Sequence, residues 1–316
     1  MGGTPLARQL RSSPFVVAMA TRYVPGMSIR TLAAALLLWG ASLAAQPAAK
    51  PAAKPAAKPA AAPASHPVDR APGALARAHA HNDYQHDRPL LGAFERGFAS
   101  IEADIYLVGG ALLVAHARDS VTADRTLEAL YLAPLRTLVA RSGGRLRADG
   151  APLYLLIDIK GDADSTYAVL DPLLRRYADV FTAFDGDRMT ARPVVAVLSG
   201  NRPIATVSAA RTRLASLDGR LPDLADGASP PPAAVMPLVS ESWDEITKWR
   251  GIGPAPAAAR AAVARAVARA HAQGRRLRFW GTPDDEAIWQ LLYDAGVDLL
   301  NADDLDRLGA FLDARR

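Results

Sequence analysis

Three of the chain's six histidines, His79, His81 and His86, lie close together in the stretch RAHAHNDYQHDRP. A fourth, His116, ends an apolar run, and Lys160 ends the run PLYLLIDIK. Two imidazoles beside a cation can serve as general base and general acid, and a lysine can stabilise negative charge on a phosphoryl oxygen. These residue types suit phosphodiester cleavage, with His86 expected to be a solvated loop residue.

Two carboxylates, Glu102 and Asp104, interrupt the apolar run IEADI. Alternate residues of a strand point to the same side, so the two carboxylates would repel each other unless a cation lies between them. Asp158 and the amide oxygen of Asn82 can join this group, and ligands that are all oxygen suit Ca²⁺ or Mg²⁺. We therefore predict one divalent cation. The alternative places Glu102 and Asp104 on an outer surface, paired with arginines.

Short β-leaning runs alternate with helical segments from about residue 70 onward. The expected strands span residues 74–80, 100–108, 152–160, 194–200, 213–219, 234–240, 276–282 and 297–304. This alternation predicts parallel βαβ units, and with residues 112–116 counted as an extension of the second strand the chain has about eight of them, the number in a (β/α)8 barrel. No glycine-rich phosphate loop follows the first strand, which disfavours a doubly wound sheet. We expect an α/β protein with a single TIM-like barrel over residues 70–316.

Polar residues end most of these strands, and in a barrel the carboxyl ends of all strands meet on one face, where chemistry is placed. The residues expected there are His79, His81, Asn82, Glu102, Asp104, His116, Asp158, Lys160, Ser199, Asn201, Arg202, Trp280, Asn301, Asp303 and Asp304.

The N-terminal region predicts export. Residues 1–45 have the features of a signal peptide, with Arg30, the apolar run TLAAALLLWG and a small-x-small sequence at 42–44. The apolar run is half the ~20 residues that a membrane span needs, so we expect no stable membrane span, and an uncleaved anchor is the alternative. Met27 is a second candidate start. Residues 46–69 repeat Pro-Ala-Ala-Lys and predict a disordered linker. The expected location is periplasmic or secreted.

The charge of the chain excludes one class of partner. The formal net charge is +5, from 37 basic and 32 acidic residues, but residues 1–68 hold seven of the basic residues and no acid. The remainder therefore carries 30 basic and 32 acidic residues, a net charge of −2. We expect no nucleic-acid binding. The chain has no cysteine, so neither disulfides nor thiolate chemistry contribute. The sequence does not indicate an oligomeric state.

Four motifs occur in order: His81-Asn82-x-Tyr84, Glu102-x-Asp104, His116 and Asp158-x-Lys160. This set resembles the superfamily of phosphatidylinositol-specific phospholipases C and glycerophosphodiester phosphodiesterases. The string HAHNDYQHDRPLLGAFERGFASIEADIYL is most similar to the altered-inheritance-of-mitochondria-type members, many of them bacterial and uncharacterised. The resemblance runs from about residue 75 to the C-terminus and is strongest over 79–160.

The resemblance implies a barrel enzyme that hydrolyses a small-molecule or lipid-derived phosphodiester. It implies His81 and His116 as the catalytic pair and Lys160 as a phosphate-binding residue. The implied ligands of one Ca²⁺ or Mg²⁺ ion are Glu102, Asp104, Asp158 and Asn82.

The chain departs from the family pattern in places. Glycerophosphodiesterases carry His-Arg-Gly where this chain has His-Asn-Asp at 81–83, so Arg202 becomes a candidate phosphate ligand, with surface placement as the alternative. His79 fits the His-x-x-Asn of sphingomyelinase D, and it lies on the same strand face as His81, so the choice of base stays open and His79 is otherwise a substrate-binding candidate. We favour His81. Trp280 resembles a pocket-wall tryptophan of the sphingomyelinase branch, and a packed core aromatic is the alternative.

Two other functions stay open. An amidohydrolase-type metal hydrolase also begins with His-x-His at the first strand, which His79 and His81 fit, but such zinc sites need further histidines. After His116 only His271 remains, on an expected surface helix. The other alternative is a catalytically silent exported binding protein. Metal-dependent turnover distinguishes the three.

Overall fold

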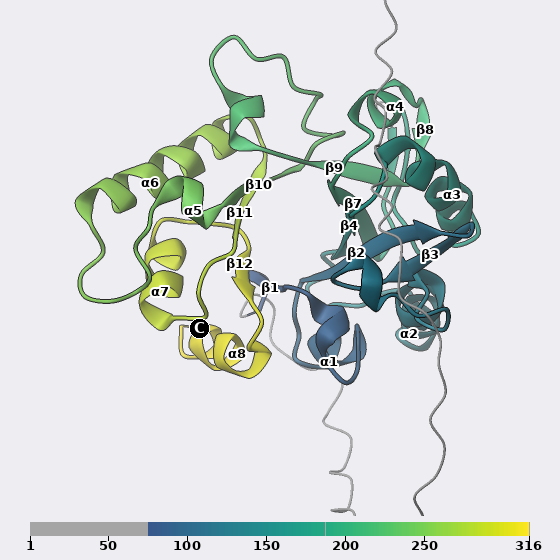
Figure 1. Cartoon of the computed structure of the whole chain (residues 1–316), viewed down its shortest axis with the longest axis horizontal. Helices are drawn as coiled ribbons and strands as arrows, with labels where there is room; N and C mark the ends of the chain where they lie inside the picture. Colours follow the sequence, from purple (N-terminus) through teal and green to yellow (C-terminus); the bar gives the residue numbers. More distant parts are fainter. Residues whose placement is uncertain (1–74, 187, 316) are drawn as a thin grey trace, which may run out of the picture. The chain divides into compact units, whose positions relative to one another are not determined.

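Eight parallel strands form a ring in the computed structural model, which describes residues 75–186 and 188–315 (Figure 1). They are β1 (Ala78–Ala80), β2 (Ser100–Val108), β4 (Leu153–Ile159), β7 (Val194–Gly200), β9 (Ala215–Gly219), β10 (Leu238–Ser242), β11 (Arg276–Trp280) and β12 (Leu300–Ala302). They pair in the order β11-β10-β9-β7-β4-β2-β1-β12, and a parallel bridge between Arg278 and Leu299 closes the ring. The predicted (β/α)8 barrel is confirmed. The predicted signal peptide and linker lie outside the described residues.

Helices follow the strands and lie outside the ring (Figure 1). They are α1 (Leu91–Glu95), α2 (Ala133–Arg141), α3 (Ala163–Arg175), α4 (Ile204–Ala209), α5 (Trp243–Ile246), α6 (Ala257–Ala272), α7 (Glu286–Asp294) and α8 (Leu305–Asp313). Asp162, Asp285 and Asp304 cap α3, α7 and α8 by accepting hydrogen bonds from backbone N–H groups of the first turn. None of the described helices has both the length and the apolar character to cross a membrane.

The sequence predicted that residues 112–116 extend the second strand, and this prediction is wrong. Residues Ala111–Val114 form β3, which pairs antiparallel with β2 because Gly109 and Gly110 adopt positive φ and reverse the chain. The reversal brings the following segment back to β2, where the Ala115 N–H donates to the Asp104 carbonyl at 3.3 Å. His116 is thereby placed next to Asp104. A separate small sheet contains β5 (Ala183–Asp185), β6 (Arg188–Thr190) and β8 (Thr212–Arg213).

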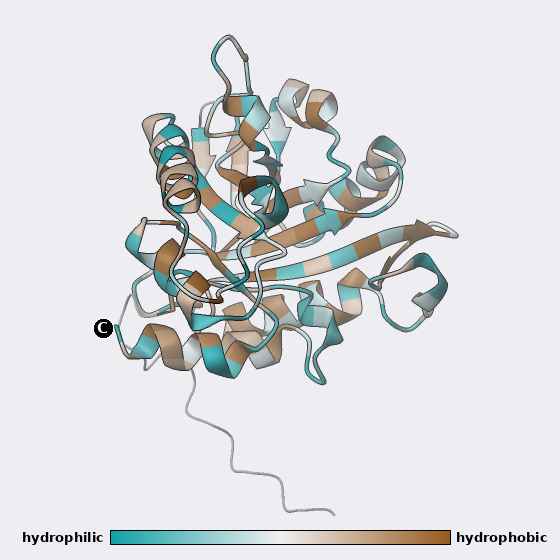
Figure 2. Ribbon diagram, turned by 60° about the vertical axis from the view of Figure 1, so that its left-hand side comes forward, coloured by the Kyte–Doolittle hydropathy of each residue, from teal (hydrophilic) through white to brown (hydrophobic). Residues whose placement is uncertain are grey.

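The strands separate two hydrophobic regions. On β2 the residues Ile101, Ala103 and Ile105 belong to the large core that also contains the helix residues, as predicted. Inside the ring, a small apolar cluster consists of Leu156, Val197, Leu238 and Leu299. Polar residues share this inner face, because side chains alternate along each strand. Figure 2 shows strands that are mainly hydrophobic but interrupted by hydrophilic residues.

Candidate active site at the carboxyl ends of the strands

Three carboxylates gather inside the ring. Glu102 and Asp104 lie on β2 and Asp158 on β4, where the register sets Asp104 beside Asp158. Glu102 and Asp104 are buried, Asp158 is half-buried, and one oxygen of each lies within 4.8 Å of the others. The prediction that Glu102 and Asp104 face the barrel interior is confirmed.

Two buried or half-buried cations contact these carboxylates. Lys160 Nζ lies 3.0 Å from Asp104 Oδ2 and 3.1 Å from Asp158 Oδ1. Arg278 Nη1 donates to Glu102 Oε2 at 2.6 Å. An arginine does pair with Glu102, as the alternative reading required, but it does so inside the barrel. With all groups ionised, three carboxylates and two cations leave a net charge of −1.

The surroundings shift the pKa values of the three carboxylates in different directions. Burial, followed by the charge of Glu102, raises the pKa of Asp104 to about 7. Burial also raises the pKa of Asp158 above its usual value. Burial opposes the charge of Glu102 too, but Arg278 and the hydrogen bond from His79 outweigh it and lower the pKa of Glu102. The environment therefore disfavours ionisation of Asp104 and Asp158, and an additional cation would offset this cost.

The donor set fits a hard divalent cation. Asp104 Oδ1 is buried and accepts no hydrogen bond from the described residues, so it is available as a ligand. Among the described residues the group of side chains that could hold a metal contains three carboxylates and no histidine. Oxygen ligands favour Ca²⁺ or Mg²⁺, whereas an amidohydrolase zinc site would need histidines.

His81 is half-buried at the end of β1 and is oriented by an acid. Its Nδ1 lies 2.8 Å from Asp303 Oδ1, on the segment that follows β12. Burial opposes the charged imidazole, but the hydrogen bond with Asp303 and the charge of Glu102 outweigh it and raise the pKa of His81. With Nδ1–H donating to Asp303, Nε2 is left without a hydrogen-bond partner among the described residues.

His79 lies inside the barrel with no exposed surface. Nδ1 is 2.7 Å from Ser100 Oγ, Nε2 is 2.9 Å from Glu102 Oε2, and the Arg278 guanidinium lies against Nε2. Burial and then the charge of Arg278 lower the pKa of His79 to about 3. Its ring is therefore neutral, and it orients Glu102 instead of facing the solvent.

Tyr84 connects Asn82 and His116 to the carboxylate cluster. Its hydroxyl lies 2.8 Å from Asn82 Oδ1, 2.7 Å from Asp104 Oδ2 and 3.1 Å from His116 Nδ1. Asn82 has φ of 46°, a left-handed conformation that asparagine tolerates better than most residues. The His116 side chain is 64% exposed, so it can reach a molecule bound at the face. The structure thus brings Asn82 and His116 next to the carboxylates.

Arg202 and Trp280 lie at the ends of β7 and β11. Arg202 donates to the Asp218 carbonyl at 2.5 Å and lies 3.6 Å from Asp223, so other groups already engage its guanidinium. Its predicted contact with phosphate stays a prediction. Trp280 is 40% exposed, an unusual value for a core aromatic and one that suits a pocket wall.

Comparison with known proteins identifies the family. A protein from Eremothecium gossypii, "Altered inheritance of mitochondria protein 6", is 32% identical over 278 residues, which cover 75% of this chain and 69% of the relative. A homologue from Arthroderma benhamiae is 30% identical over 260 residues, covering 72% and 81%. The chain belongs to the altered inheritance of mitochondria protein 6 family. Both relatives are fungal, so membership of a bacterial branch stays a prediction.

Two family models match this member. The AIM6-like phosphodiesterase domain matches residues 74–216, and the glycerophosphoryl diester phosphodiesterase family matches residues 276–306. Among solved structures, a glycerophosphodiester phosphodiesterase from Parabacteroides distasonis has a TM-score of 0.46 and 13% identity, covering 76% of this chain and 96% of that one. One from Agrobacterium tumefaciens has a TM-score of 0.41 and 16% identity, covering 76% and 95%. The barrel assignment rests on the strand pairing described above.

Three site residues of this family member were not assigned a role from the sequence: Arg278, Tyr84 and Asp303. Arg278 precedes Trp280 by two residues in RLRFW, so strand alternation points both to the same side. The sequence did contain a signal for Arg278, namely a charged residue on the same side of the strand as the aromatic residue at its end. Asp303 was recognised only as a strand-end residue, and its contact with His81 spans 222 positions of sequence.

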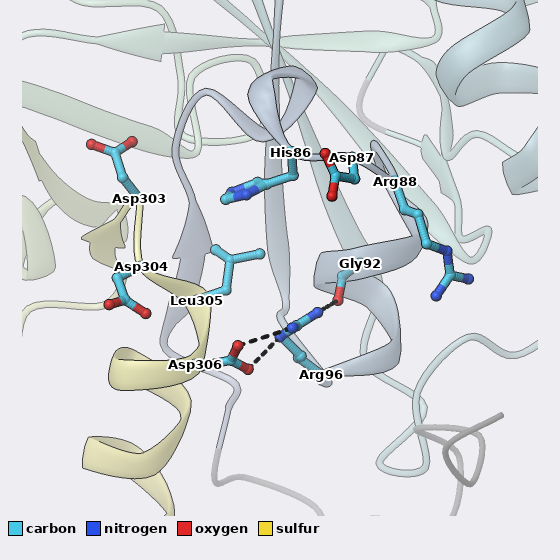
Figure 3. A pocket seen from close by; sticks show the side chains of 9 residues that line it. All are labelled: His86, Asp87, Arg88, Gly92, Arg96, Asp303, Asp304, Leu305 and Asp306. Atoms are coloured by element: carbon cyan, nitrogen blue, oxygen red, sulfur yellow. Dashed lines mark hydrogen bonds and ion pairs between the residues drawn. The ribbon is translucent and has the colours of Figure 1, made fainter. Parts of the chain in front are cut away.

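A cavity of about 490 Å³ flanks the site between α1 and α8 (Figure 3). It is lined by His86, Asp87, Arg88, Gly92, Arg96, Asp303, Asp304, Leu305 and Asp306. Arg96 forms an ion pair with Asp306 across it, at 2.7 Å. The cavity adjoins the His81–Asp303 pair but contains none of the three carboxylates, so it is separate from the cation cluster.

Replacing Gly200 by alanine is expected to displace Asp158. Gly200 has φ of 66°, and a Cβ there would lie 2.2 Å from Asp158 Oδ1 and 2.5 Å from the Ile159 carbonyl. We expect G200A to lower the free energy of unfolding by about 1–3 kcal/mol. G309A is the matched control, because a Cβ in the middle of α8 meets no atom within 4 Å, and it should raise stability by about 0.5–1 kcal/mol. Equal effects in urea denaturation would contradict the close approach at Gly200.

The metal-free protein is expected to lose stability as the pH rises from about 4 to about 7. Burial raises the pKa of Asp83 to about 6 and, together with Glu102, that of Asp104 to about 7. A carboxyl with a raised pKa in the folded state binds more protons there than in the unfolded chain, so deprotonation favours unfolding. His79, whose pKa burial lowers from 6.5 to about 3, has the opposite effect between these values, and the two carboxyls together outweigh it. Denaturant titrations in EDTA should show this decline. Added Ca²⁺ or Mg²⁺ should reduce the part of this loss of stability that Asp104 causes. An unchanged dependence of the free energy of unfolding on pH would argue against cation binding.

Proposed function

We propose that this protein is an exported, metal-dependent phosphodiester hydrolase acting on a small-molecule or lipid-derived diester. The observation that carries the proposal is the juxtaposition of a three-carboxylate cluster, Lys160 and two accessible histidines at the carboxyl ends of the strands. The family matches named above support the phosphodiesterase class. Export, to the periplasm or outside the cell, is supported by the signal-peptide pattern in residues 1–45.

Glu102, Asp104 and Asp158, with the amide oxygen of Asn82, would hold one Ca²⁺ or Mg²⁺ ion. When bound, the ion supplies Lewis-acid polarisation of a phosphoryl oxygen. A divalent ion changes the net charge of the cluster with Lys160 and Arg278 from −1 to +1. A phosphodiester carries one negative charge, so its binding neutralises the loaded site.

His81 acts as the base. Its Nδ1–H donates to Asp303, so Nε2 carries a lone pair and accepts the proton of a substrate hydroxyl or of water. His79 is less suited to this step, because both its ring nitrogens are engaged inside the barrel. His79 instead fixes the orientation of Glu102.

His116 acts as the acid on the leaving group. Its Nδ1 lies 3.1 Å from the Tyr84 hydroxyl, which holds the ring beside Asp104 while most of the side chain stays exposed. Nε2 then delivers the proton to the departing alkoxide. Lys160, 3.0 Å from Asp104, places a positive charge where a phosphoryl oxygen gains negative charge.

The proposal is tested by assaying the full chain with bis(p-nitrophenyl) phosphate and with glycerophosphodiesters. The assay is run in EDTA and then with Ca²⁺, Mg²⁺ or Zn²⁺ added. Turnover restored by Ca²⁺ or Mg²⁺ is expected. Activity with Zn²⁺ alone would favour the amidohydrolase-type hydrolase. Absence of turnover with every metal, in folded protein, would favour the binding protein.

A further inference from the structure

Arg278 is the one arginine within hydrogen-bond distance of the carboxylate cluster among the described residues. It is 2% exposed, and its Nη1 reaches from β11 to Glu102 Oε2 on β2 at 2.6 Å. Its other polar partners are neutral: Nε donates to Ser240 Oγ at 3.2 Å, Nη1 lies 3.4 Å from Asn301 Oδ1, and the ring of His79 is uncharged. Glu102 is thus the only ion-pair partner that the described residues provide for this buried charge.

Glu102 is also a candidate ligand of the cation, so the guanidinium lies one carboxylate away from the ion. A positive charge at that distance repels a divalent cation and attracts an anion bound to the same cluster. Arginine keeps its charge at all accessible pH values, so this contribution is permanent. Lys160, in contrast, contacts the two aspartates and leaves Glu102 to Arg278.

We propose that Arg278 is a positioning and specificity residue that weakens metal binding in order to strengthen phosphodiester binding. The inference rests on the proposed function. Without the guanidinium, the cluster with Lys160 would have a net charge of −2, and the loaded site a charge of zero. The ion would bind more tightly, and the loaded site would no longer attract a monoanion. Arg278 thus supplies the excess positive charge that the loaded site presents to the diester.

Opposite changes in the two affinities are the signature of this role. A purely structural arginine would disturb the carboxylates when removed, and metal and substrate affinity would then fall together. A unit charge a few ångströms from a divalent ion is worth on the order of a tenfold change in affinity even at the dielectric constant of water. We therefore expect R278Q to bind Ca²⁺ or Mg²⁺ about tenfold more tightly, and to have a KM for bis(p-nitrophenyl) phosphate about tenfold higher at saturating metal.

The experiment measures metal binding by calorimetry at pH 8, without substrate, in the full-length wild type, R278Q, R278K and R275Q. R278K keeps the charge and should resemble wild type in metal affinity. R275Q is the matched control, because Arg275 is also buried but donates to the Met236 and Pro231 carbonyls, at 2.6 and 2.7 Å. It should leave both affinities unchanged. Thermal unfolding of each variant verifies folding.

The outcomes separate this inference from the proposed function. If wild type binds neither ion and hydrolyses no diester, the proposed function fails. If wild type binds the ion and R278Q binds it equally or more weakly, the role given to Arg278 is wrong. Should R278Q fail to fold, R278K and R278M decide: tighter metal binding in R278M alone supports the inference, and equal binding in both overturns it.

Discussion

Replacing His81 by glutamine is expected to lower kcat for phosphodiester hydrolysis by about 10²- to 10⁴-fold, the range for loss of a general base. The imidazole Nε2 has no partner among the described residues, and Asp303 fixes the ring through Nδ1 at 2.8 Å. Glutamine preserves a polar side chain but cannot accept a proton at neutral pH. Because the substitution changes none of the carboxylates that would bind the cation, metal affinity should remain within about twofold of wild type.

H86Q is the matched control for this substitution. His86 lies five residues further along the same loop and lines the cavity between α1 and α8 (Figure 3), and none of the three clustered carboxylates lines that cavity. Its replacement should leave kcat unchanged. D303N should show an intermediate loss, because it leaves His81 in place but removes the acid that orients it. Wild-type kcat in H81Q would remove His81 from the mechanism, and the same measurement on H79Q would then determine whether His79 is the base.

Replacing Asp104 by asparagine is expected to abolish metal-dependent activity and to stabilise the metal-free protein. Asp104 contacts Tyr84 and Lys160 and keeps its second oxygen free for a ligand. Metal affinity should fall by more than about 100-fold, the upper end for residues that merely support a ligand. The pKa of Asp104, raised to about 7 by burial and by Glu102, shows that its charge opposes folding at neutral pH. Removing that charge should raise the free energy of unfolding in EDTA by about 1–3 kcal/mol at pH 8.

D218N provides the contrast. Asp218 is also a buried carboxylate of the barrel interior, on β9, but it lies outside the group of three carboxylates, and Ser199 Oγ and Arg220 Nη1 donate to its Oδ2 at 2.8 and 2.9 Å. Its replacement should lower stability, because Arg220 loses its partner, and should leave metal affinity unchanged. Calorimetry for the metal and urea denaturation for stability distinguish the two variants. A loss of stability in D104N equal to that in D218N would show that Asp104 serves the fold and not a cation.

A cluster of charges that serves a ligand should show opposed effects of this kind, in which one substitution weakens binding and stabilises the protein without its ligand. Like charges brought together inside a barrel cost folding free energy, and the ligand or ion that they serve offsets the cost. The inward face of β2 illustrates this, since its neighbours on the outer face, Ile101 and Ile105, are fully buried and apolar. The strand satisfies the hydrophobic core with one face and carries the chemistry on the other.

The sequence alone was sufficient for the barrel and for most of the cluster. Eight apolar runs separated by helical segments predicted eight strands, because periodicity is a local property that hydrophobic burial imposes on every segment. Strand alternation was also enough to place Glu102 and Asp104 on one inner face. One local feature was missed, since the positive φ of Gly109 and Gly110 turned the expected extension of the second strand into β3.

Only the tertiary structure decided which side chains meet across the barrel. His79 and His81 share a strand face and cannot be distinguished by periodicity, but the closed ring buries His79 between Ser100 and Glu102 and leaves His81 half-exposed beside Asp303. Arg278 reaches Glu102 across 176 positions of sequence. These contacts depend on ring closure, strand register and the reach of long side chains, none of which is encoded in the spacing of neighbouring residues. Composition and periodicity therefore determined the elements and their inner faces, while the closure of the barrel assigned each polar residue its partner.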